Sequence, residues 1–253
     1  MKKSIYLTVV IPAFNEINNL KKGVLEDVYE YLHKQDYTWE VLVVDDGSTD
    51  TTSVEVGKFA SRHKNFTLLK EPHRGKAGSV IAGMLKGSGK NIVFIDMDMA
   101  TPIEELEHLL PKLDAGYDIA IGSRSGRKGA PIVRKLMAYG FTVLRFLILR
   151  LPFRDTQCGF KGFSRKATQT IFQRMLVYTK EQSIKGSAVT AGFDLEVLYV
   201  ARKLGFKVAE VPVNWHDAGD RGGHGVNPLK DSWQGLIGLL QVRKNALLGK
   251  YKI

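Results

Sequence analysis

Five short apolar runs, each followed by a helical pattern or a polar turn, constrain the fold of this chain more than any other feature. The runs are continuous and rich in β-branched residues, which is typical of strands buried on both faces of a sheet. They are Tyr6–Ile11, Val41–Val44, Thr67–Leu69, Ile92–Ile95 and Ile119–Ile121. The segments between them repeat apolar residues at three- and four-residue spacing, as amphipathic helices do. These segments are Asn18–Lys34, Thr51–His63, Lys76–Lys86 and Pro102–Ala115. The alternation predicts an α/β fold with a mostly parallel central sheet flanked by helices.

The chain is long enough for one substantial core. It has 253 residues, 44% of them hydrophobic, and no stretch with the length of an inter-domain linker. We expect one domain over residues 1–230, followed by an amphipathic helix over residues 231–253. The lysines before the first apolar run resemble the start of a signal peptide, but Pro12 and the lack of a small-residue cleavage pattern favour a buried strand.

Charge and cysteine content narrow the classes of partner. A formal net charge of +11 predicts attraction to polyanions, whether nucleic acid, anionic lipid head groups or phosphorylated substrates. The single cysteine, Cys158, excludes an intramolecular disulfide and fits a reducing compartment. Arg145 and Arg150 interrupt the best candidate for a membrane-spanning helix, so we expect a soluble or peripheral protein.

Polar residues stand at four of the five predicted strand ends. In a parallel sheet the ligand lies outside the carboxyl ends of the strands, so these residues are expected to meet at one edge. Glu16 follows the first run, Asp45 and Asp46 the second, Asp96 and Asp98 the fourth, and Arg124 the fifth. The edge should therefore hold two acidic clusters and a cation.

The two carboxylates of Asp96 and Asp98 are candidates for a metal site. Side chains two residues apart at a strand end can turn toward one point, where they repel unless a cation lies between them. Ligation by oxygen alone suits Mg²⁺ or Mn²⁺, which keep open positions for substrate phosphates. The plainer alternative is helix capping, but Thr101 as N-cap and Pro102 as first helical residue already suffice for that.

The acids Asp45 and Asp46 strengthen the prediction, because a buried strand that runs straight into two carboxylates and a glycine is an unusual strand end. One carboxylate can accept hydrogen bonds from a nucleobase or a ribose hydroxyl. Capping of the next helix by Asp50 or Ser48 explains other polar residues of this segment but leaves these two unexplained.

The ordered motifs of the chain resemble those of family 2 glycosyltransferases with a GT-A fold, over most of its length. They are Val10 to Glu16, Val43 to Asp50, Arg74 to Gly78, and Asp96-Met97-Asp98. Three further strings resemble the branch that makes polyprenyl-phosphate sugars, above all the dolichyl-phosphate β-glucosyltransferases; they are Gly122-Ser123-Arg124, Asp155 to Lys161, and Phe193 to Glu196. The string from Asp155 to Lys161 is the most specific.

The resemblance implies a role for each matching residue. The nucleoside of the donor is expected to contact Pro12, Phe14, Glu16, Val44 and Asp46. The diphosphate and its metal are expected to contact Asp96, Met97, Asp98 and Ala100, with Asp96 and Asp98 as metal ligands and Lys76 as a weaker donor contact.

The acceptor phosphate is expected to bind Arg124 and Arg134, whose guanidinium groups can be bidentate. Asp155 is a catalytic candidate that would orient the acceptor or a neighbouring arginine.

Two segments depart from the family pattern. After Trp215-His216 a glycine-rich loop replaces the usual Gly-Ser-Lys string, and we expect Arg221 or His224 in that loop to reach the diphosphate. The segment from Met175 to Gly192 is longer than expected before Phe193-Asp194, and no function follows from it.

The expected reaction moves a hexose, with glucose favoured, from a nucleotide-diphosphate sugar, with UDP-glucose favoured, to a polyprenyl or dolichyl phosphate. Inversion is the family expectation, and an already ionised acceptor phosphate needs no strong general base. A sugar-hydroxyl acceptor is the alternative, and it would require a base such as Asp155, Asp194 or Glu196. A basic nucleic-acid-binding protein is a third reading, which the acidic strand ends and the lack of an aromatic-basic motif disfavour.

Two late stretches, Leu136 to Phe153 and Asp231 to Tyr251, are the most apolar helical ones. The second places Trp233, Leu240 and Leu247 near one face, a pattern that fits either a membrane interface or packing on the core. The implied lipid acceptor favours the membrane. We therefore expect a cytoplasmic protein held peripherally at the cytoplasmic face of a membrane.

Overall fold

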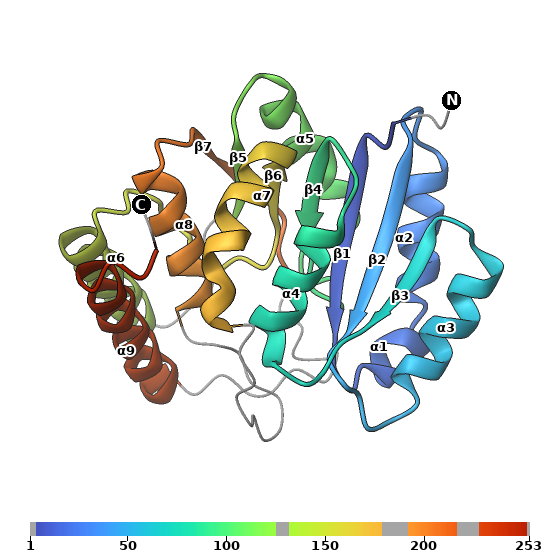
Figure 1. Ribbon diagram of the computed structural model, residues 1–253. Coiled ribbons are helices and arrows are strands. Elements are labelled where there is room, and N and C mark those ends of the chain that lie inside the picture. Colours follow the sequence, from blue (N-terminus) through green and yellow to red (C-terminus); the bar gives the residue numbers. More distant parts are fainter. Residues whose placement is uncertain (1–3, 125–131, 179–191, 217–227, 252–253) are drawn as a thin grey trace.

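The computed structural model describes residues 4–124, 132–178, 192–216 and 228–251. The described residues form a seven-stranded sheet in the order β3-β2-β1-β4-β6-β5-β7 (Figure 1). The strands are β1 (Leu7–Ala13), β2 (Trp39–Asp45), β3 (Phe66–Lys70), β4 (Asn91–Phe94), β5 (Ile119–Arg124), β6 (Lys161–Ser164) and β7 (Val208–Val213). All residues of β1 are buried, which fits the expected buried first strand.

The sheet is mostly parallel, as the alternating pattern predicts. Only β6 among the described strands runs against its neighbours, pairing antiparallel with both β4 and β5. Its sequence, Lys-Gly-Phe-Ser, contains no apolar run, so the periodicity did not reveal it. Because Lys161 at the start of β6 pairs with Phe94 at the end of β4, the segment just before β6 lies at the carboxyl edge of the parallel strands.

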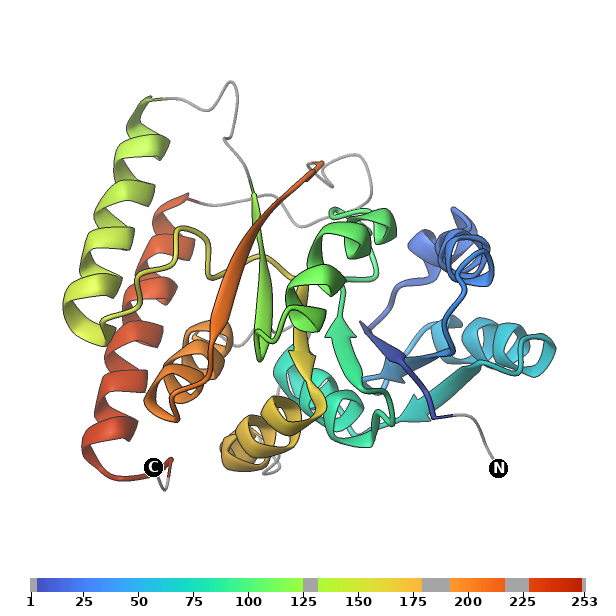
Figure 2. The ribbon, with the colours of Figure 1, turned by 90° about the horizontal axis from the view of Figure 1, so that it is seen from above.

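Helices cover both faces of the sheet. They are α1 (Ile17–Lys21), α2 (Val24–His33), α3 (Thr52–Arg62), α4 (Gly75–Lys86), α5 (Leu106–Asp114), α6 (Ile132–Leu149), α7 (Arg165–Phe172), α8 (Phe193–Lys203) and α9 (Pro228–Leu247), with 3₁₀ turns at Ile103–Glu105 and Gln173–Tyr178. The apolar side chains of α2, α3 and α5 form one core cluster with the sheet, and those of α4, α7 and α8 form a second on the other face (Figure 2).

Two helix starts differ from expectation. The helix expected over Asn18–Lys34 is two helices, because Gly23 adopts a φ of 83°, in the left-handed region, and breaks the chain direction between α1 and α2. The segment after Pro102 begins as a 3₁₀ turn at Ile103 without a side-chain cap. The hydroxyl of Thr101 instead contacts Cys158 Sγ at 3.8 Å, which ties this turn to the loop before β6.

The helices α6 and α9 lie side by side at one end of the sheet (Figures 1 and 2). Their contact is close: a Cβ on Gly235 would come within 2.9 Å of the Phe141 ring. The helix α9 begins at Pro228, three residues earlier than the expected boundary, and its inner side chains Leu239 and Val242 are buried. Within the described residues, no helix is both long and apolar enough to cross a membrane.

Candidate active site

A cavity of about 270 Å³ lies at the carboxyl edge of β1, β2 and β4, beside the first turn of α4. Eight residues singled out from the sequence line it: Pro12, Phe14, Glu16, Asp46, Lys76, Asp96, Met97 and Asp98. Four more line it: Ala13 and Gly75, which lie in the family motifs but had no role assigned, and His73 and Ser79, which the sequence did not single out. The parallel register of β1 with β2 and with β4 brings these strand ends together, as expected for an α/β sheet.

Two expected donor contacts, Val44 and Ala100, are not among the residues that line the cavity. Val44 is fully buried, with its side chain against α4 at Gly83, so the core and not the cavity surrounds it. The backbone carbonyl of Ala100 accepts a hydrogen bond from His216 N at 2.8 Å, which links the turn after β4 to the end of β7. Arg221 and His224 lie outside the described residues, as does most of the segment from Met175 to Gly192.

One end of the cavity combines a carboxylate with two stacked rings. Asp46 Oδ1 accepts a hydrogen bond from Arg74 N, and Oδ2 lies 2.8 Å from His73 Nδ1. The His73 ring stacks on Phe14 with 4.2 Å between ring centroids. Sequence spacing could not have identified His73, because it lies 27 residues from Asp46 in the chain. Planar rings beside a buried hydrogen-bonding carboxylate suit a nucleobase and its ribose.

Asp45 does not share this role. Its Oδ1 accepts a hydrogen bond from Ser48 N at 3.1 Å, so it shapes the turn after β2 and leaves Asp46 to face the cavity. Asp50 accepts a hydrogen bond from Thr52 N at 2.8 Å at the start of α3. The N-cap residue is nevertheless Thr51, without a side-chain cap bond, and not the expected Asp50 or Ser48.

The opposite end of the cavity is acidic and holds one lysine. Lys76 Nζ lies 2.5 Å from Asp96 Oδ1. Burial alone would lower the pKa of Lys76, but the nearby carboxylates of Asp96, Asp194 and Asp98 raise it, so the ammonium stays charged. The pKa of Glu16 is raised by burial and by the charges of Asp98 and Asp96. Negative charge is therefore crowded here, and Lys76 only partly offsets it.

The acidic end suits a divalent cation that also binds substrate oxygens. Asp96 Oδ1 is buried and accepts no hydrogen bond of good geometry from the described residues; its partner is the Lys76 ammonium. Among the same described residues, no group of three or more His, Cys, Asp or Glu side chains gathers in the manner of a closed metal site. Two carboxylates with open positions fit Mg²⁺ or Mn²⁺ shared with a diphosphate.

The loop before β6 touches the acidic end directly. A Cβ on Gly159 would stand 2.0 Å from Asp96 Oδ2, so only a glycine allows the carboxylate its present position. The loop is anchored by Lys161, which is fully buried, lies 2.5 Å from Asp194 Oδ1 and donates to the Cys158 carbonyl. Nothing in the apolar pattern marked Gly159 as a neighbour of Asp96.

The side of the site next to β5 holds a partly buried ion pair. The Arg124 guanidinium binds Asp155 in bidentate fashion, with Nε–Oδ2 at 2.6 Å and Nη2–Oδ1 at 2.9 Å, and lies over the Trp215 ring. Burial would raise the pKa of Asp155, but Arg124 outweighs it and lowers that pKa. Asp155 is thus an ionised partner that orients Arg124. Arg134 lies in the first turn of α6, but its side chain is not among those described.

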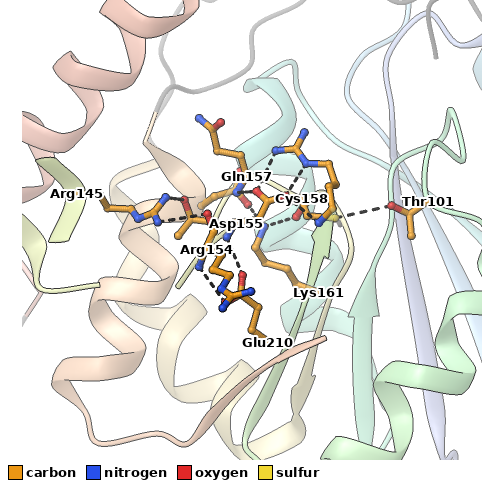
Figure 3. A network of polar contacts seen from close by, with 11 residues as sticks. Thr101, Arg145, Arg154, Asp155, Gln157, Cys158, Lys161 and Glu210 are labelled. Carbon is orange, nitrogen blue, oxygen red and sulfur yellow. Dashed lines mark hydrogen bonds and ion pairs between the residues drawn. The ribbon is translucent and has the colours of Figure 1, made fainter. Parts of the chain in front are cut away.

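Further contacts hold the Asp155 loop in place (Figure 3). The Glu210 carboxylate of β7 accepts hydrogen bonds from the backbone N–H groups of Arg154 and Asp155, at 2.9 and 2.7 Å. The buried Arg145 of α6 donates to the Thr156 hydroxyl at 3.2 Å and to the Phe153 carbonyl. Cys158 is buried, and burial raises the pKa of its thiol, so it packs in the core as a protonated side chain.

The mostly parallel sheet and the acidic cavity at its carboxyl edge define a GT-A-like α/β domain of the nucleotide-sugar transferase class. The chain belongs to glycosyl transferase family 2, whose family model matches residues 8–172. Among curated proteins it is 32% identical to a dolichyl-phosphate β-glucosyltransferase of Dictyostelium discoideum, over 99% of this chain and 77% of that protein. It is 33% identical to the human dolichyl-phosphate β-glucosyltransferase, over 83% of this chain and 67% of the human one.

Solved structures share the fold at low sequence identity. Glucosyl-3-phosphoglycerate synthase from Mycobacterium tuberculosis, in complex with uridine diphosphate, aligns with a TM-score of 0.63 and 22% identity, over 96% of this chain and 82% of that one. The mannosyltransferase PcManGT from Pyrobaculum calidifontis, in complex with GDP-mannose and Mn²⁺, aligns with a TM-score of 0.54 and 20% identity, over 98% of this chain and 75% of that one.

Proposed function

We propose that this family 2 glycosyltransferase transfers glucose from UDP-glucose to a dolichyl or other polyprenyl phosphate, with inversion at the anomeric carbon. The observation that carries the proposal is the division of the site, with an acidic, ring-lined cavity on one side and the Arg124–Asp155 pair on the other. The names of the curated relatives supply the glucosyl group and the dolichyl phosphate. The acidic half suits a metal-bound nucleoside diphosphate, and the Arg124 guanidinium, oriented by Asp155, suits a second phosphate.

In the proposed mechanism, an oxygen of the acceptor phosphate attacks the anomeric carbon of the sugar. The bond between that carbon and the diphosphate breaks, and its electron pair leaves with the nucleoside diphosphate. Arg124, oriented by Asp155, would hold the attacking phosphate, and Lys76 would face the departing diphosphate. Asp96 and Asp98 would hold Mg²⁺ or Mn²⁺, which supplies positive charge beside the departing oxygens.

The described carboxylates favour a phosphate acceptor over a sugar hydroxyl. A hydroxyl needs a free general base, and each candidate for that role is engaged. Asp155 pairs with Arg124, Asp194 pairs with Lys161, and Glu196 is fully buried with a hydrogen bond from Tyr251. An acceptor phosphate is already ionised near neutral pH and needs no such base.

A lipid-linked acceptor places the reaction at a membrane surface, and we propose peripheral attachment on the cytoplasmic side. The exposed apolar side chains of α6 and α9 support attachment through these helices. Nucleic acid is not the proposed polyanion, because the cavity at the strand ends is lined by carboxylates and would repel a phosphate backbone.

The direct test is transfer of labelled glucose. UDP-glucose with Mn²⁺ and a short polyprenyl phosphate in detergent should yield a lipid-linked glucose that is stable to phosphatase, whereas glucose or glucosides as acceptors should yield no product. UDP-glucose should also stabilise the fold only in the presence of Mg²⁺ or Mn²⁺, by about 2.7 kcal/mol in the free energy of unfolding at a hundredfold excess over Kd. A rise in the melting temperature reports this stabilisation. Transfer to a soluble sugar without any lipid product would overturn the assignment of the acceptor.

Replacing Arg124 by lysine should raise the KM for the acceptor phosphate while leaving donor binding unchanged. The lysine ammonium keeps the positive charge, but it lacks the planar guanidinium that lets arginine bind Asp155 and a phosphate at the same time. The loss of one charge-assisted hydrogen bond predicts a decrease of about tenfold or more in kcat/KM. Initial rates over a range of acceptor concentrations measure this. Arg62→Lys on the exposed end of α3 is the control; an equal change in the KM for the nucleotide sugar would contradict the role given to Arg124.

A further inference from the structure

A second cavity, of about 220 Å³, lies away from the proposed active site, between the ends of α6 and α8 and the last turns of α9. Four cationic side chains line it: Arg150, Arg202, Lys203 and Arg243. Its other lining residues are Ile148, Leu149 and Tyr199, so no carboxylate faces it among the described residues. The helices α8 and α9 and the residue that follows α6 thus direct positive charge to one small space.

These cations have no carboxylate partner in the described part of the chain, where none of the four takes part in an ion pair. Aromatic rings hold two of them: the Arg150 guanidinium lies 5.9 Å from the Phe146 ring centroid, and the Lys203 ammonium 5.9 Å from that of Tyr199. Neutralisation of the α8 C-terminus accounts for Arg202 and Lys203. It does not account for Arg243, which reaches the same cavity from α9.

The cavity adjoins an apolar surface on the same two helices. Ten of the twelve large hydrophobic side chains that are exposed in the described residues lie on α6 or on α9 and the residue after it. This α6–α9 apolar face consists of Tyr139, Val143, Leu144, Phe146, Leu147, Trp233, Ile237, Leu240, Leu247 and Leu248. Phe146 belongs to the face and also carries the Arg150 guanidinium, so face and cavity meet at this residue. An apolar patch of this kind marks an interaction site.

We propose that the cavity is a binding site for the phosphate head group of an anionic phospholipid, and that the α6–α9 apolar face enters the acyl boundary of the same membrane. The charge and polarity of the surface favour this ligand. The four cations of the cavity suit a negatively charged head group, and the exposed leucine and aromatic side chains beside them suit its acyl chains. The sequence of α6 contains no Asp or Glu that would oppose such a surface. The inference rests on the proposed function only in that a lipid acceptor brings the protein to a membrane.

Each cation near an anionic membrane surface contributes about 1 kcal/mol to binding, which corresponds to a roughly fivefold change in the dissociation constant. Removing both Arg202 and Lys203 should therefore weaken binding to anionic membranes by more than tenfold. Both residues are exposed, and neither contributes to the proposed active site, so the fold and the transfer reaction in detergent should be unaffected.

The test is flotation of the full chain with vesicles of phosphatidylcholine, with and without phosphatidylglycerol, and without any nucleotide sugar. Wild-type protein should bind the phosphatidylglycerol vesicles at least tenfold more tightly. The Arg202→Gln/Lys203→Gln variant should lose that difference. The Arg62→Gln/Lys64→Gln variant, which removes the same charge at the far end of the sheet, should keep it. Equal loss in the two variants, or equal binding of the wild type to both kinds of vesicle, would overturn the head-group site.

A second pair of variants tests the apolar face. Leu240→Glu on α9 should abolish binding to all vesicles, whereas Val54→Glu on α3 should not; the two side chains are 54% and 55% exposed, so the pair is matched. Unchanged binding of Leu240→Glu would overturn the role of the face. Because vesicle binding needs no sugar transfer, a protein that binds vesicles but forms no glucolipid would contradict the proposed function alone.

Discussion

Replacing Asp98 by asparagine should lower the rate of sugar transfer about a thousandfold, which corresponds to roughly 4 kcal/mol of transition-state stabilisation. Asp98 lines the acidic end of the cavity together with Asp96 and Glu16. The change removes a negative ligand where we expect the metal and the departing diphosphate. The fold should persist, because Asp98 Oδ1 accepts a hydrogen bond from Ala100 N that an amide oxygen can also accept. Single-turnover transfer of labelled glucose, with UDP-glucose and Mn²⁺, measures the effect.

The control for this variant is Asp50→Asn. Asp50 accepts a similar local hydrogen bond, from Thr52 N, but does not line the cavity. It should retain transfer within a few-fold of the wild type. The Asp98 variant should also lose the stabilisation by UDP that depends on Mn²⁺, although its own melting temperature stays close to that of the wild type. A variant that keeps both the rate and this metal dependence would remove Asp98 from the site.

Gly159→Ala should reduce transfer by about a hundredfold with little loss of stability. The added methyl group would stand 2.0 Å from Asp96 Oδ2, and the carboxylate must rotate away to make room. A side-chain end moves at low cost to the fold, but a displacement of about 1 Å at a reacting centre can cost roughly this factor in rate. The measurements are kcat for transfer and the free energy of unfolding from urea titration.

Gly57→Ala is the matched control for the glycine. Gly57 lies inside α3, and the added Cβ would meet the Leu68 side chain of β3 at 3.7 Å, an ordinary contact, so activity should be unchanged and stability equal or higher. If Gly159→Ala unfolds the protein, the close approach of Gly159 to Asp96 serves packing and not the position of the carboxylate, and the prediction is wrong. If it leaves both stability and rate intact, Asp96 does not act from the position seen here.

The regular part of the fold could be predicted because continuous β-branched runs and helical spacing are local signals. The same signals placed Glu16, Asp46, Asp96 and Asp98 at one edge, since parallel strands end together. What could not be predicted depends on contacts distant in sequence. Arg124 and Asp155 lie 31 residues apart, and no spacing rule pairs them.

Short or atypical segments escaped prediction for a related reason. The strand β6 carries Lys161 and Gly162 where an apolar run would be expected, and its place in the sheet comes from pairing with β4 and β5. The break at Gly23 was equally hidden, because an isolated glycine within a helical pattern is commonly tolerated. Family resemblance drew attention to the segment from Asp155 to Lys161, but only the structure gives its contact with Asp96.

The position of β6 between β4 and β5 implies an order of assembly during synthesis. The strands β1 to β4 can pair as soon as they have been made, which completes the cavity that Asp46, Asp96 and Asp98 line. The strand β5 must then wait, because its native neighbours β6 and β7 both follow it in the chain. Premature pairing of β5 with the open edge of β4 would block the place of β6 and must dissociate before native pairing can proceed. The nascent chain can thus form the half that we propose for the nucleotide sugar first, and it gains the half proposed for the acceptor only when a later strand inserts.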